Sequence, residues 1–394
     1  MKLLLQNDKN RIGSSGINAN ELKWSVWNDR IDVDENKIVV FNTFLRNAVL
    51  MDVSEIKEPG KLDESRLNTL FQLGILVASD KDEKKEWEMQ FLKGKEDLSY
   101  IDLTILLTQN CQMQCVYCFE GAKGKSRISR STMNDILLFL ESRAVTCKRL
   151  RVTWFGGEPL LAYDRLKELS VVMMNFCKDH CIEYSADITT NGFALNRRRC
   201  DELISCLNVR RYIITVDGPE DIHEQRRPLV SRKPSFPVIW RNIEMLTEMG
   251  AWVTMRMTID KNNVSYIPAL LDRIAGSKLN RRIGLAFCRT VDYNYAPDGI
   301  SESLYSETEF ADVEWRLIRY AHRLGLWKYR FRSPLKDAVC KECVLVPLCN
   351  GGCPHNALFA DKKHGTQSGC PDWKANYQRQ IKSLIAENYD SEII

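Results

Sequence analysis

The sequence predicts an α/β protein whose main part is a partial (βα)6 barrel of the TIM type. Strand and helix signals alternate between residues 100 and about 290 of the 394-residue chain. Repeated strand–helix units predict a parallel sheet, and six of them make part of a barrel. The expected strands are short apolar runs at residues 101–107, 150–155, 184–189, 211–216, 252–259 and 283–287.

A helix is expected after the first of these strands, at residues 131–145. Ser131 has the side chain of an N-cap, and Ile136, Leu137 and Leu140 recur at the spacing of one helix face. Barrels of this kind carry their chemistry at the carboxyl ends of the strands. The motifs that follow each strand are therefore the candidate functional residues.

A smaller α/β segment precedes the barrel. Two strands are expected at 37–41 and 48–51, with a turn at Asn42, then a helix at 63–73 that ends before Gly74, and a short strand at 75–77. We expect a loose arm at 1–20 and a charged linker or helix at 80–97. The predicted domains are 1–95, 96–300 and 301–394.

Composition indicates an ordinary globular protein. The chain is 44% hydrophobic and 27% charged, and its net charge of +4 is too weak to indicate nucleic acid or an acidic membrane as a partner. No run approaches the roughly 20 apolar residues of a membrane span, and the start lacks the apolar core of a signal peptide. We expect a soluble cytoplasmic protein. Its closely spaced cysteines then indicate metal or redox chemistry rather than disulfides.

Three cysteines follow the first barrel strand within one loop, at Cys111, Cys115 and Cys118. Thiolates are the usual ligands of iron–sulfur clusters, and a short loop can wrap one cubic cluster. Three ligands leave one of the four irons open, which is the mark of a reactive rather than a structural site. A structural zinc loop is the alternative, although zinc sites favour paired Cys-x-x-Cys knuckles and a fourth ligand.

Two further motifs follow the next two strands. Gly156-Gly157-Glu158-Pro159 ends the second strand, where glycines permit close approach to a ligand and a carboxylate can accept from an ammonium group. Thr189-Thr190-Asn191-Gly192 ends the third strand. A plain turn between strand and helix is the alternative for the second motif.

The fourth and fifth strands carry an aspartate and an arginine. Asp217 opens the turn Asp-Gly-Pro, which it can simply cap, but a carboxylate buried beside a substrate would have a pKa raised towards that of a useful base. Arg256 lies inside the fifth strand, where a buried guanidinium needs an anion. A structural salt bridge is the alternative for Arg256.

The pattern Cys111-x-x-x-Cys115-x-x-Cys118, with Tyr117 before the last cysteine, resembles the signature of the radical S-adenosylmethionine (SAM) superfamily. The resemblance implies a 4Fe-4S cluster that binds SAM and cleaves it reductively to methionine and a 5'-deoxyadenosyl radical, which takes a hydrogen atom from the substrate. The passage that runs from Asp217-Gly218-Pro219 to Arg226 resembles one in peptide-modifying and sulfatase-maturing radical SAM enzymes, which implies that Asp217 faces the substrate as a base. The residues that the resemblance to the superfamily assigns to SAM are Tyr117, Gly156, Gly157, Glu158, Thr190, Asn191 and Arg256.

A second set of cysteines lies near the carboxyl end, at Cys340, Cys343, Cys349, Cys353 and Cys370. It resembles the auxiliary-cluster domain, called SPASM, of peptide-maturing radical SAM enzymes. The resemblance implies an auxiliary 4Fe-4S cluster on Cys340, Cys343, Cys349 and Cys370, and a second cluster on Cys353. Cys288 is the only cysteine between Cys206 and Cys340, so Cys288 and Cys353 cannot alone complete a second set of four ligands. Zinc is the alternative metal here.

The segment before the barrel is similar to the small winged-helix-like domain of radical SAM enzymes that modify ribosomal peptides. There the leader of a precursor peptide adds as a strand at a sheet edge; a packing module without a ligand is the alternative. The resemblance predicts a peptide maturase that installs a thioether or carbon–carbon crosslink, with a flavodoxin- or ferredoxin-type electron donor. Formylglycine formation in sulfatases is the alternative activity. The non-enzymatic alternative is an iron–sulfur or zinc-stabilised binding or electron-transfer protein.

Overall fold

The computed structural model describes residues 2–5, 21–57, 62–95, 97–118, 120, 124–292 and 301–326. These residues fall into two units, of which one holds the described residues up to 95 and the other those from 97 onward. Each unit has its own sheet and its own core. The auxiliary-cluster cysteines Cys340, Cys343, Cys349, Cys353 and Cys370 lie outside the described residues.

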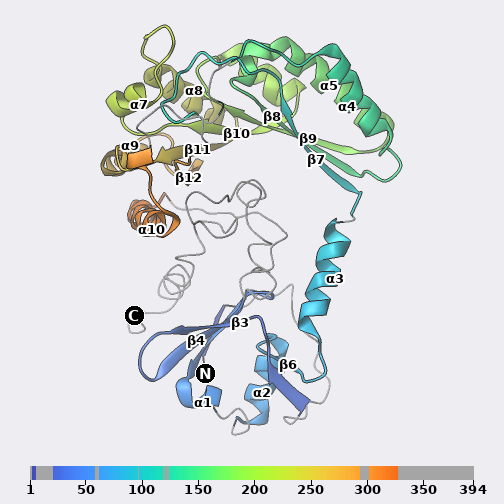
Figure 1. Cartoon of the computed structure of the whole chain (residues 1–394), viewed down its shortest axis with the longest axis vertical. Coiled ribbons are helices and arrows are strands. Elements are labelled where there is room, and N and C mark those ends of the chain that lie inside the picture. Colours follow the sequence, from blue (N-terminus) through green and yellow to red (C-terminus); the bar gives the residue numbers. More distant parts are fainter. Residues whose placement is uncertain are drawn as a thin grey trace. The chain divides into compact units, whose positions relative to one another are not determined.

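The larger unit is built on one sheet of six parallel strands in the order β12-β11-β10-β9-β8-β7. Each strand pairs with its neighbour in sequence, as the strands of a barrel do. The sheet ends at β7 and β12, so it is an open, partial barrel (Figure 1). Its strands are β7 (Tyr100–Leu106), β8 (Arg149–Phe155), β9 (Glu183–Thr190), β10 (Val209–Thr215), β11 (Trp252–Ile259) and β12 (Ile283–Arg289).

Helices connect these strands. They are α4 (Arg130–Glu141), α5 (Tyr163–Asp179), α6 (Arg197–Asp201), α7 (Glu220–Arg226), α8 (Phe236–Glu248), α9 (Ile267–Ala275) and α10 (Glu307–Arg323). Short turns of other helix types lie at Pro159–Ala162, Glu202–Cys206, Val264–Tyr266 and Ser301–Ser303. Every expected barrel strand is present, with ends within two residues of the expected ones. The helix expected at 131–145 begins at Arg130 and is capped by Ser129 rather than Ser131, because the Ser129 hydroxyl accepts from the backbone of Thr132 at 3.0 Å.

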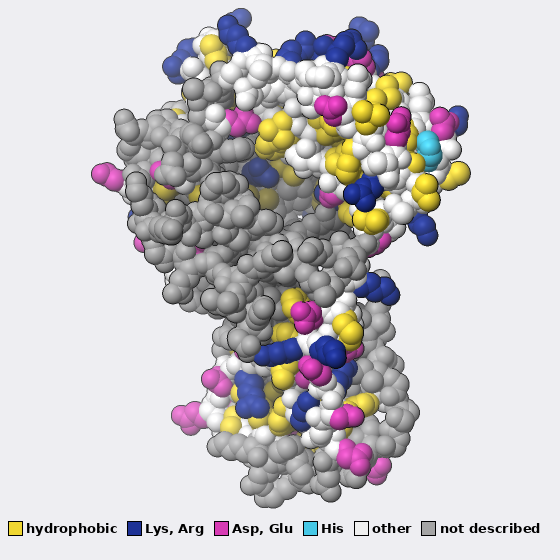
Figure 2. Space-filling model, turned by 45° about the vertical axis from the view of Figure 1, so that its right-hand side comes forward, with side chains coloured by type: hydrophobic (Ala, Val, Ile, Leu, Met, Phe, Trp, Pro, Cys, Tyr) yellow, Lys and Arg dark blue, Asp and Glu magenta, His cyan; other side chains and the backbone are white. Residues whose placement is uncertain are grey.

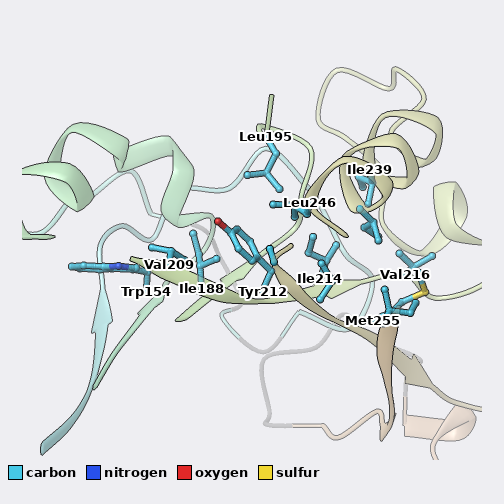
Figure 3. Close-up of a cluster of buried hydrophobic side chains, with 14 of the residues drawn as sticks. Trp154, Ile188, Leu195, Val209, Tyr212, Ile214, Val216, Ile239, Leu246 and Met255 are labelled. Atoms are coloured by element: carbon cyan, nitrogen blue, oxygen red, sulfur yellow. The ribbon is translucent and has the colours of Figure 1, made fainter. Parts of the chain in front are cut away.

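The two faces of the six-stranded sheet differ in character. Alternate residues of the strands form a buried apolar face under the helices, and Figure 3 shows Ile188, Tyr212 and Ile214 of the sheet beneath Ile239 and Leu246 of α8. The other face is polar. Near the amino ends of the strands, Arg151 and Arg211 both pair with Asp187, at 3.2 and 2.8 Å. Period-two alternation then places the polar residues at the carboxyl ends on this same face.

The last described helix, α10, belongs to the barrel unit. Its buried residues Phe310, Leu317 and Ile318 are part of the barrel core, and the Tyr320 hydroxyl donates to Asp272 of α9 at 2.8 Å. The barrel unit therefore extends past residue 300, where the sequence predicts a boundary. The amphipathic spacing of α10 explains why it packs there. Within the described residues no helix is both long and apolar enough to cross a bilayer.

The smaller unit has a four-stranded antiparallel sheet in the order β1-β5-β4-β3 and a two-stranded sheet of β2 and β6. Its strands are β1 (Lys2–Leu5), β2 (Leu22–Trp24), β3 (Asn28–Asp32), β4 (Lys37–Asn42), β5 (Asn47–Asp52) and β6 (Leu76–Ala78). Its helices are α1 (Val53–Lys57), α2 (Glu64–Gln72) and α3 (Glu83–Lys95). Residues 2–5 were expected in a loose arm but form β1, which pairs with β5.

Both faces of the larger sheet in this unit are apolar. Val40, Val49 and Met51 pack with residues of α2, while Val39 and Phe41 pack on the opposite face with Ile31 of β3. Basic and acidic side chains are interspersed over the surface of the unit (Figure 2). Because the strand order is β1-β5-β4-β3, the edges of the sheet are β1 and β3. The winged-helix-like assignment stays a prediction.

Candidate active site

A pocket of about 290 Å³ lies at the carboxyl ends of the barrel strands. All three cysteines of the first loop line it, together with residues from the ends of β8, β9, β10, β11 and β12. The lining residues that the sequence singles out are Cys111, Cys115, Tyr117, Cys118, Gly156, Gly157, Thr190, Asn191 and Arg256. The barrel thus brings together motifs that are widely separated along the chain. Among the expected site residues that the structure describes, Glu158 and Asp217 do not line the pocket.

The loop that carries the three cysteines is held by a segment much later in the chain. Gln114 donates its backbone N–H to the carbonyl of Pro228 at 2.8 Å, and Val116 donates to Arg226 at 3.0 Å. An isolated antiparallel bridge joins Met113 to Leu229. The loop therefore pairs with residues 226–229 through main-chain hydrogen bonds, as one strand pairs with another, and these bonds fix the positions of the three cysteines.

The three thiols are partly exposed to the pocket, and no disulfide joins the described cysteines. No three His, Cys, Asp or Glu side chains in the described residues lie close enough together to bind a single metal ion. A cluster in which each thiolate binds a different iron needs no shared point, so the donor set suits an iron–sulfur cluster. Cys111 Sγ also accepts from the backbone N–H of Met113 at 3.4 Å.

The two glycines after β8 fit closely against the cysteine loop. A Cβ on Gly156, where φ is 128°, would lie 2.4 Å from the Thr108 carbonyl oxygen, and one on Gly157 would lie 2.6 Å from that of Asn110. The backbone of Gly157 donates to Thr108 at 2.9 Å. From the sequence we expected these glycines to permit close approach to a ligand. In the structure, a side chain is excluded at both positions because the backbone of the cysteine loop lies against them. Both glycines still form part of the pocket wall.

Glu158 is fully buried and bonds to the turn after β9 instead of facing the pocket. Its carboxylate accepts from the Thr190 hydroxyl at 2.7 Å, the Asn191 backbone at 2.7 Å and the Leu160 backbone at 3.0 Å. Burial raises the pKa of this carboxyl above its ordinary value. These partners occupy the oxygens that were expected to accept from a ligand ammonium. Glu158 therefore positions Thr190 and Asn191, which line the pocket.

Asn191 connects the turn after β9 to the first cysteine. Its side-chain amide donates to Cys111 Sγ at 3.8 Å, and its carbonyl oxygen accepts from Gln112 at 3.3 Å and from the backbone of Phe193 at 3.0 Å. Hydrogen bonds to a ligating sulfur are one of the factors that set the properties of a cluster. Asn191 is thus placed to contact the metal ligand as well as any molecule in the pocket.

Asp217 is fully buried behind Tyr117 and is not part of the pocket wall. Its carboxylate accepts from the Tyr117 hydroxyl and from the backbone N–H of Thr258, the latter at 2.8 Å. Burial raises the pKa of the Asp217 carboxyl. The Tyr117 hydroxyl and the backbone of Thr258, at the end of β11, take the oxygens of Asp217, and a substrate-facing role for Asp217 stays a prediction. Tyr117 is the member of the pair that lines the pocket.

Arg256 is half-buried in β11 and lines the pocket. Its side chain has no hydrogen bond or ion pair to any other described residue. A structural salt bridge, the alternative that the sequence leaves open, is thus absent from the described part of the chain. The guanidinium is placed to bind an anionic group of a ligand in the pocket.

Two neighbouring arginines are site residues to which sequence reasoning assigns no role. Arg226 makes a two-pronged ion pair with Asp260 at 2.7 and 3.0 Å, and Arg227 lines the pocket and donates to the Tyr117 hydroxyl at 2.8 Å. Both are buried. The one sequence feature that could have indicated a role for them is their position in the passage that follows Asp-Gly-Pro. Cys288 of β12 also lines the pocket.

Comparison with known proteins agrees with this geometry. The radical SAM superfamily matches residues 105–274. Fe-coproporphyrin III synthase of Methanosarcina barkeri is 25% identical over 49% of this chain and 44% of its own length. The serine-type anaerobic sulfatase-maturating enzyme of Bacteroides thetaiotaomicron is 27% identical over 39% of this chain and 38% of its own. The sporulation killing factor maturation protein SkfB of Bacillus subtilis is 27% identical over 45% and 40%.

The solved structure of native anSMEcpe with bound AdoMet and Kp18Cys peptide has the same fold. It superposes with a TM-score of 0.54 at 13% identity, over 72% of this chain and 99% of that one. The chain spans about two fifths of the length of the three curated relatives named above. The matched segment includes the cysteine loop and the ends of β8 to β11. Residues 105–274 are therefore a radical SAM domain, through which the chain is related to sulfatase- and peptide-maturing members of the radical SAM superfamily.

Proposed function

We propose that this protein is a radical SAM enzyme that modifies a ribosomally made precursor peptide. The observation that carries the proposal is the single pocket in which three thiols, two glycines and an unpaired arginine meet at the carboxyl ends of the strands. When bound there, a 4Fe-4S cluster supplies the electron that cleaves SAM, and the resulting deoxyadenosyl radical takes hydrogen from the substrate. The residues of the chain bind, orient and enclose these groups.

The pocket residues that the sequence singles out each have a role in this proposal. Cys111, Cys115 and Cys118 hold the cluster. Gly156 and Gly157 form the wall beside the loop, Thr190 and Asn191 contact SAM from the end of β9, and Arg256 binds its carboxylate, for which a guanidinium fork is suited. Tyr117 closes the pocket between the cysteines and Asp217. Glu158 and Asp217 act through the neighbours that they position.

The peptide substrate rests on the relatives and on the smaller unit. Two of the relatives are named as maturation enzymes, and the structural neighbour holds a peptide. In the smaller unit β3 is a sheet edge, to which the leader of a precursor can add as a strand. The modification that we propose is a thioether or carbon–carbon crosslink. An auxiliary 4Fe-4S cluster on Cys340, Cys343, Cys349 and Cys370, with Cys353 nearby, belongs to the same proposal, as does a flavodoxin- or ferredoxin-type electron donor.

Formylglycine formation in a sulfatase is the second candidate, because a sulfatase-maturating enzyme is among the relatives. It differs in its substrate requirement. A sulfatase-derived peptide carries no leader, so a formylglycine-forming enzyme would act on it without help from the smaller unit. A peptide maturase is expected to need the leader, and deletion of the leader should abolish its product.

The test is anaerobic reconstitution followed by iron and sulfide counting and an assay for 5'-deoxyadenosine with dithionite. We expect about eight irons per chain, and SAM cleavage that depends on Cys115. Cys115→Ala should lose about four irons and all cleavage, whereas Cys181→Ala, at an exposed cysteine outside the pocket, should lose neither. Zinc in place of iron and no cleavage would overturn the enzyme proposal.

Substrate class is decided by three parallel reactions of the reconstituted enzyme. One contains a candidate precursor peptide with its leader, one a sulfatase-derived peptide, and one an iron tetrapyrrole precursor of Fe-coproporphyrin III, because a synthase of that compound is also among the relatives. Mass loss on the precursor peptide alone supports the proposal. Product from either of the other two would replace it.

A further inference from the structure

Arg227 is a buried guanidinium that contacts the cysteine loop from the side of α7. It is 7% exposed and lines the pocket. Its Nη1 donates to the Tyr117 hydroxyl at 2.8 Å and its Nη2 donates to the Sδ of Met113 at 3.7 Å. Met113 and Tyr117 both lie between Cys111 and Cys118 in sequence. Arg227 therefore contacts the loop at two points, one on each side of Cys115.

The carboxylates around Arg227 bond to other donors. Asp217 is separated from Arg227 by the Tyr117 hydroxyl, and Asp260 is paired with Arg226 at 2.7 Å. Within the described part of the chain no ion pair joins Arg227 to a carboxylate, and its buried Nε has no hydrogen-bond partner. A buried cation is costly unless an anion compensates it. The anionic groups that interact electrostatically with Arg227 are the Cys115 thiolate, first, and the Asp217 carboxylate.

A cubic cluster on three thiolates carries a net negative charge, which increases by one unit on reduction. The reduction potential of such a cluster depends on net charge, on hydrogen bonds to its sulfurs and on exposure. A fixed positive charge beside the loop stabilises the more negative, reduced form more than the oxidised form. Burial strengthens this effect, because the screening by water is weak.

We propose that Arg227 is a positioning residue that raises the reduction potential of the cluster held by Cys111, Cys115 and Cys118. This inference rests on the proposed function, since it requires that cluster. Arg227 remains protonated and transfers neither electron nor proton. The electron comes from the low-potential donor, and the guanidinium makes its acceptance by the cluster more favourable. Tyr117 is held in the same contact, so loss of Arg227 also frees the tyrosine from one of its two partners.

The test is a redox titration of the reconstituted full-length protein, followed by the EPR signal of the reduced cluster. Arg227→Met removes the charge and the hydrogen bonds, Arg227→Gln removes the charge but can still donate, and Arg227→Lys keeps the charge. We expect the ratio of reduced to oxidised cluster at a fixed potential to fall at least about tenfold in the Met and Gln variants. For one electron that is a shift of about 59 mV to lower potential. The Lys variant should change less than about threefold.

The matched control is Arg211→Met, which makes the same substitution at an arginine near the amino end of β10, paired with Asp187 at 2.8 Å. We expect no change in its potential. All titrations are run with and without SAM. If the shift appears only with SAM present, Arg227 pairs with the SAM carboxylate and the proposal is wrong. An unchanged potential in Arg227→Gln, or a shift in the Met variant alone, also overturns it.

Iron counts distinguish a failure of this inference from a failure of the proposed function. If the wild type binds no cluster, the proposed function fails. If the wild type and Arg227→Gln hold equal iron and have equal potentials, the function stands and this inference fails. If Arg227→Met cannot assemble its cluster, the Gln and Lys variants decide the question, because both retain a donor for Tyr117.

Discussion

The Tyr117 hydroxyl donates to the buried carboxylate of Asp217, and in this way the cysteine loop is joined to the turn that ends β10. The same hydroxyl accepts from Arg227 at 2.8 Å. Tyr117 thus lies between the pocket and a carboxylate that would otherwise be an obvious base. We therefore propose that Asp217 positions Tyr117.

The pair can be tested by a double-mutant cycle. Tyr117→Phe deprives Asp217 of one of its two donors, and Asp217→Asn weakens the same bond from the other side, so each should cost about 1–3 kcal/mol of unfolding free energy. Because both changes break one contact, the double variant should cost less than the sum. Urea unfolding of the four proteins without metal measures this. Additive costs would show that the two residues act separately.

Gly157 is predicted to be essential for the shape of the cysteine loop. In Gly157→Ala the new Cβ would lie 2.6 Å from the carbonyl oxygens of Gln109 and Asn110, so the loop backbone must move. We expect a loss of about 1–3 kcal/mol in stability and a lower iron content after reconstitution.

The control for Gly157→Ala is Gly276→Ala, where the Cβ would meet only the Asp272 carbonyl oxygen, at 3.5 Å. Its stability and iron content should match the wild type. Equal iron content in Gly157→Ala and the wild type would mean that the loop tolerates the displacement, contrary to the fit seen here.

Glu158 predicts a particular pH dependence of stability. Burial raises the pKa of its carboxyl in the folded protein above the ordinary value of 4.5. Between these two pKa values the folded state binds more protons than the unfolded state, so the contribution of Glu158 to stability falls as pH rises through that window. The unfolding free energy of the wild type minus that of Glu158→Gln should therefore decrease with rising pH above about 4.5. Urea unfolding of both proteins across that range measures the slope; a rising difference would show a lowered pKa instead.

The edge of the smaller unit offers a test of leader binding. The backbone N–H of Val33 donates to Lys37, and that of Thr43 donates to Trp27. Hydrogen-bonded and non-hydrogen-bonded pairs alternate along an antiparallel ladder, so the pair of Arg30 and Val40 is not hydrogen-bonded, and the N–H of Arg30 points away from β4. Arg30→Pro removes that donor without breaking the bonds to β4. If a leader adds beside β3, its affinity should fall at least about tenfold.

Arg30→Ala is the matched control, because it keeps the N–H and removes the side chain that lies over Trp24. Its affinity for a labelled candidate precursor should stay near that of the wild type. Fluorescence anisotropy gives both values. Equal binding by Arg30→Pro and Arg30→Ala would place the leader somewhere other than this edge.

The barrel could be predicted from sequence because its signals are redundant. Each strand of the large sheet places apolar residues on its helix-covered face, and most strands are followed by a motif with glycine or a polar turn. β3 was missed because Asn28–Asp32 has only one apolar residue, Ile31, and its place is set by pairing with β4. The polar residues were harder. Sequence spacing placed Glu158 and Asp217 at strand ends, but which side chain reaches the pocket depends on neighbours from other strands.

Arg227 shows the limit of such reasoning most clearly. Nothing local distinguishes it from Arg226. Yet the Arg226 guanidinium pairs with Asp260 and lies over the ring of Tyr117, whereas the Arg227 guanidinium donates to the Tyr117 hydroxyl and to Met113 Sδ. The difference arises because α7 ends at Arg226, so the two side chains leave the chain in different directions. Only the packed structure contains that information.

The bridge between Met113 and Leu229 joins two segments of the site that are synthesised at different times. During synthesis the cysteine loop leaves the ribosome long before the segment that holds it, and contacts between positions so distant along a chain form slowly. The three thiols therefore acquire their spacing only after β10 and α7 have been made and docked. We therefore expect a metal to be inserted late, because a nascent or truncated chain that ends before residue 226 has the cysteines without the segment that holds their loop.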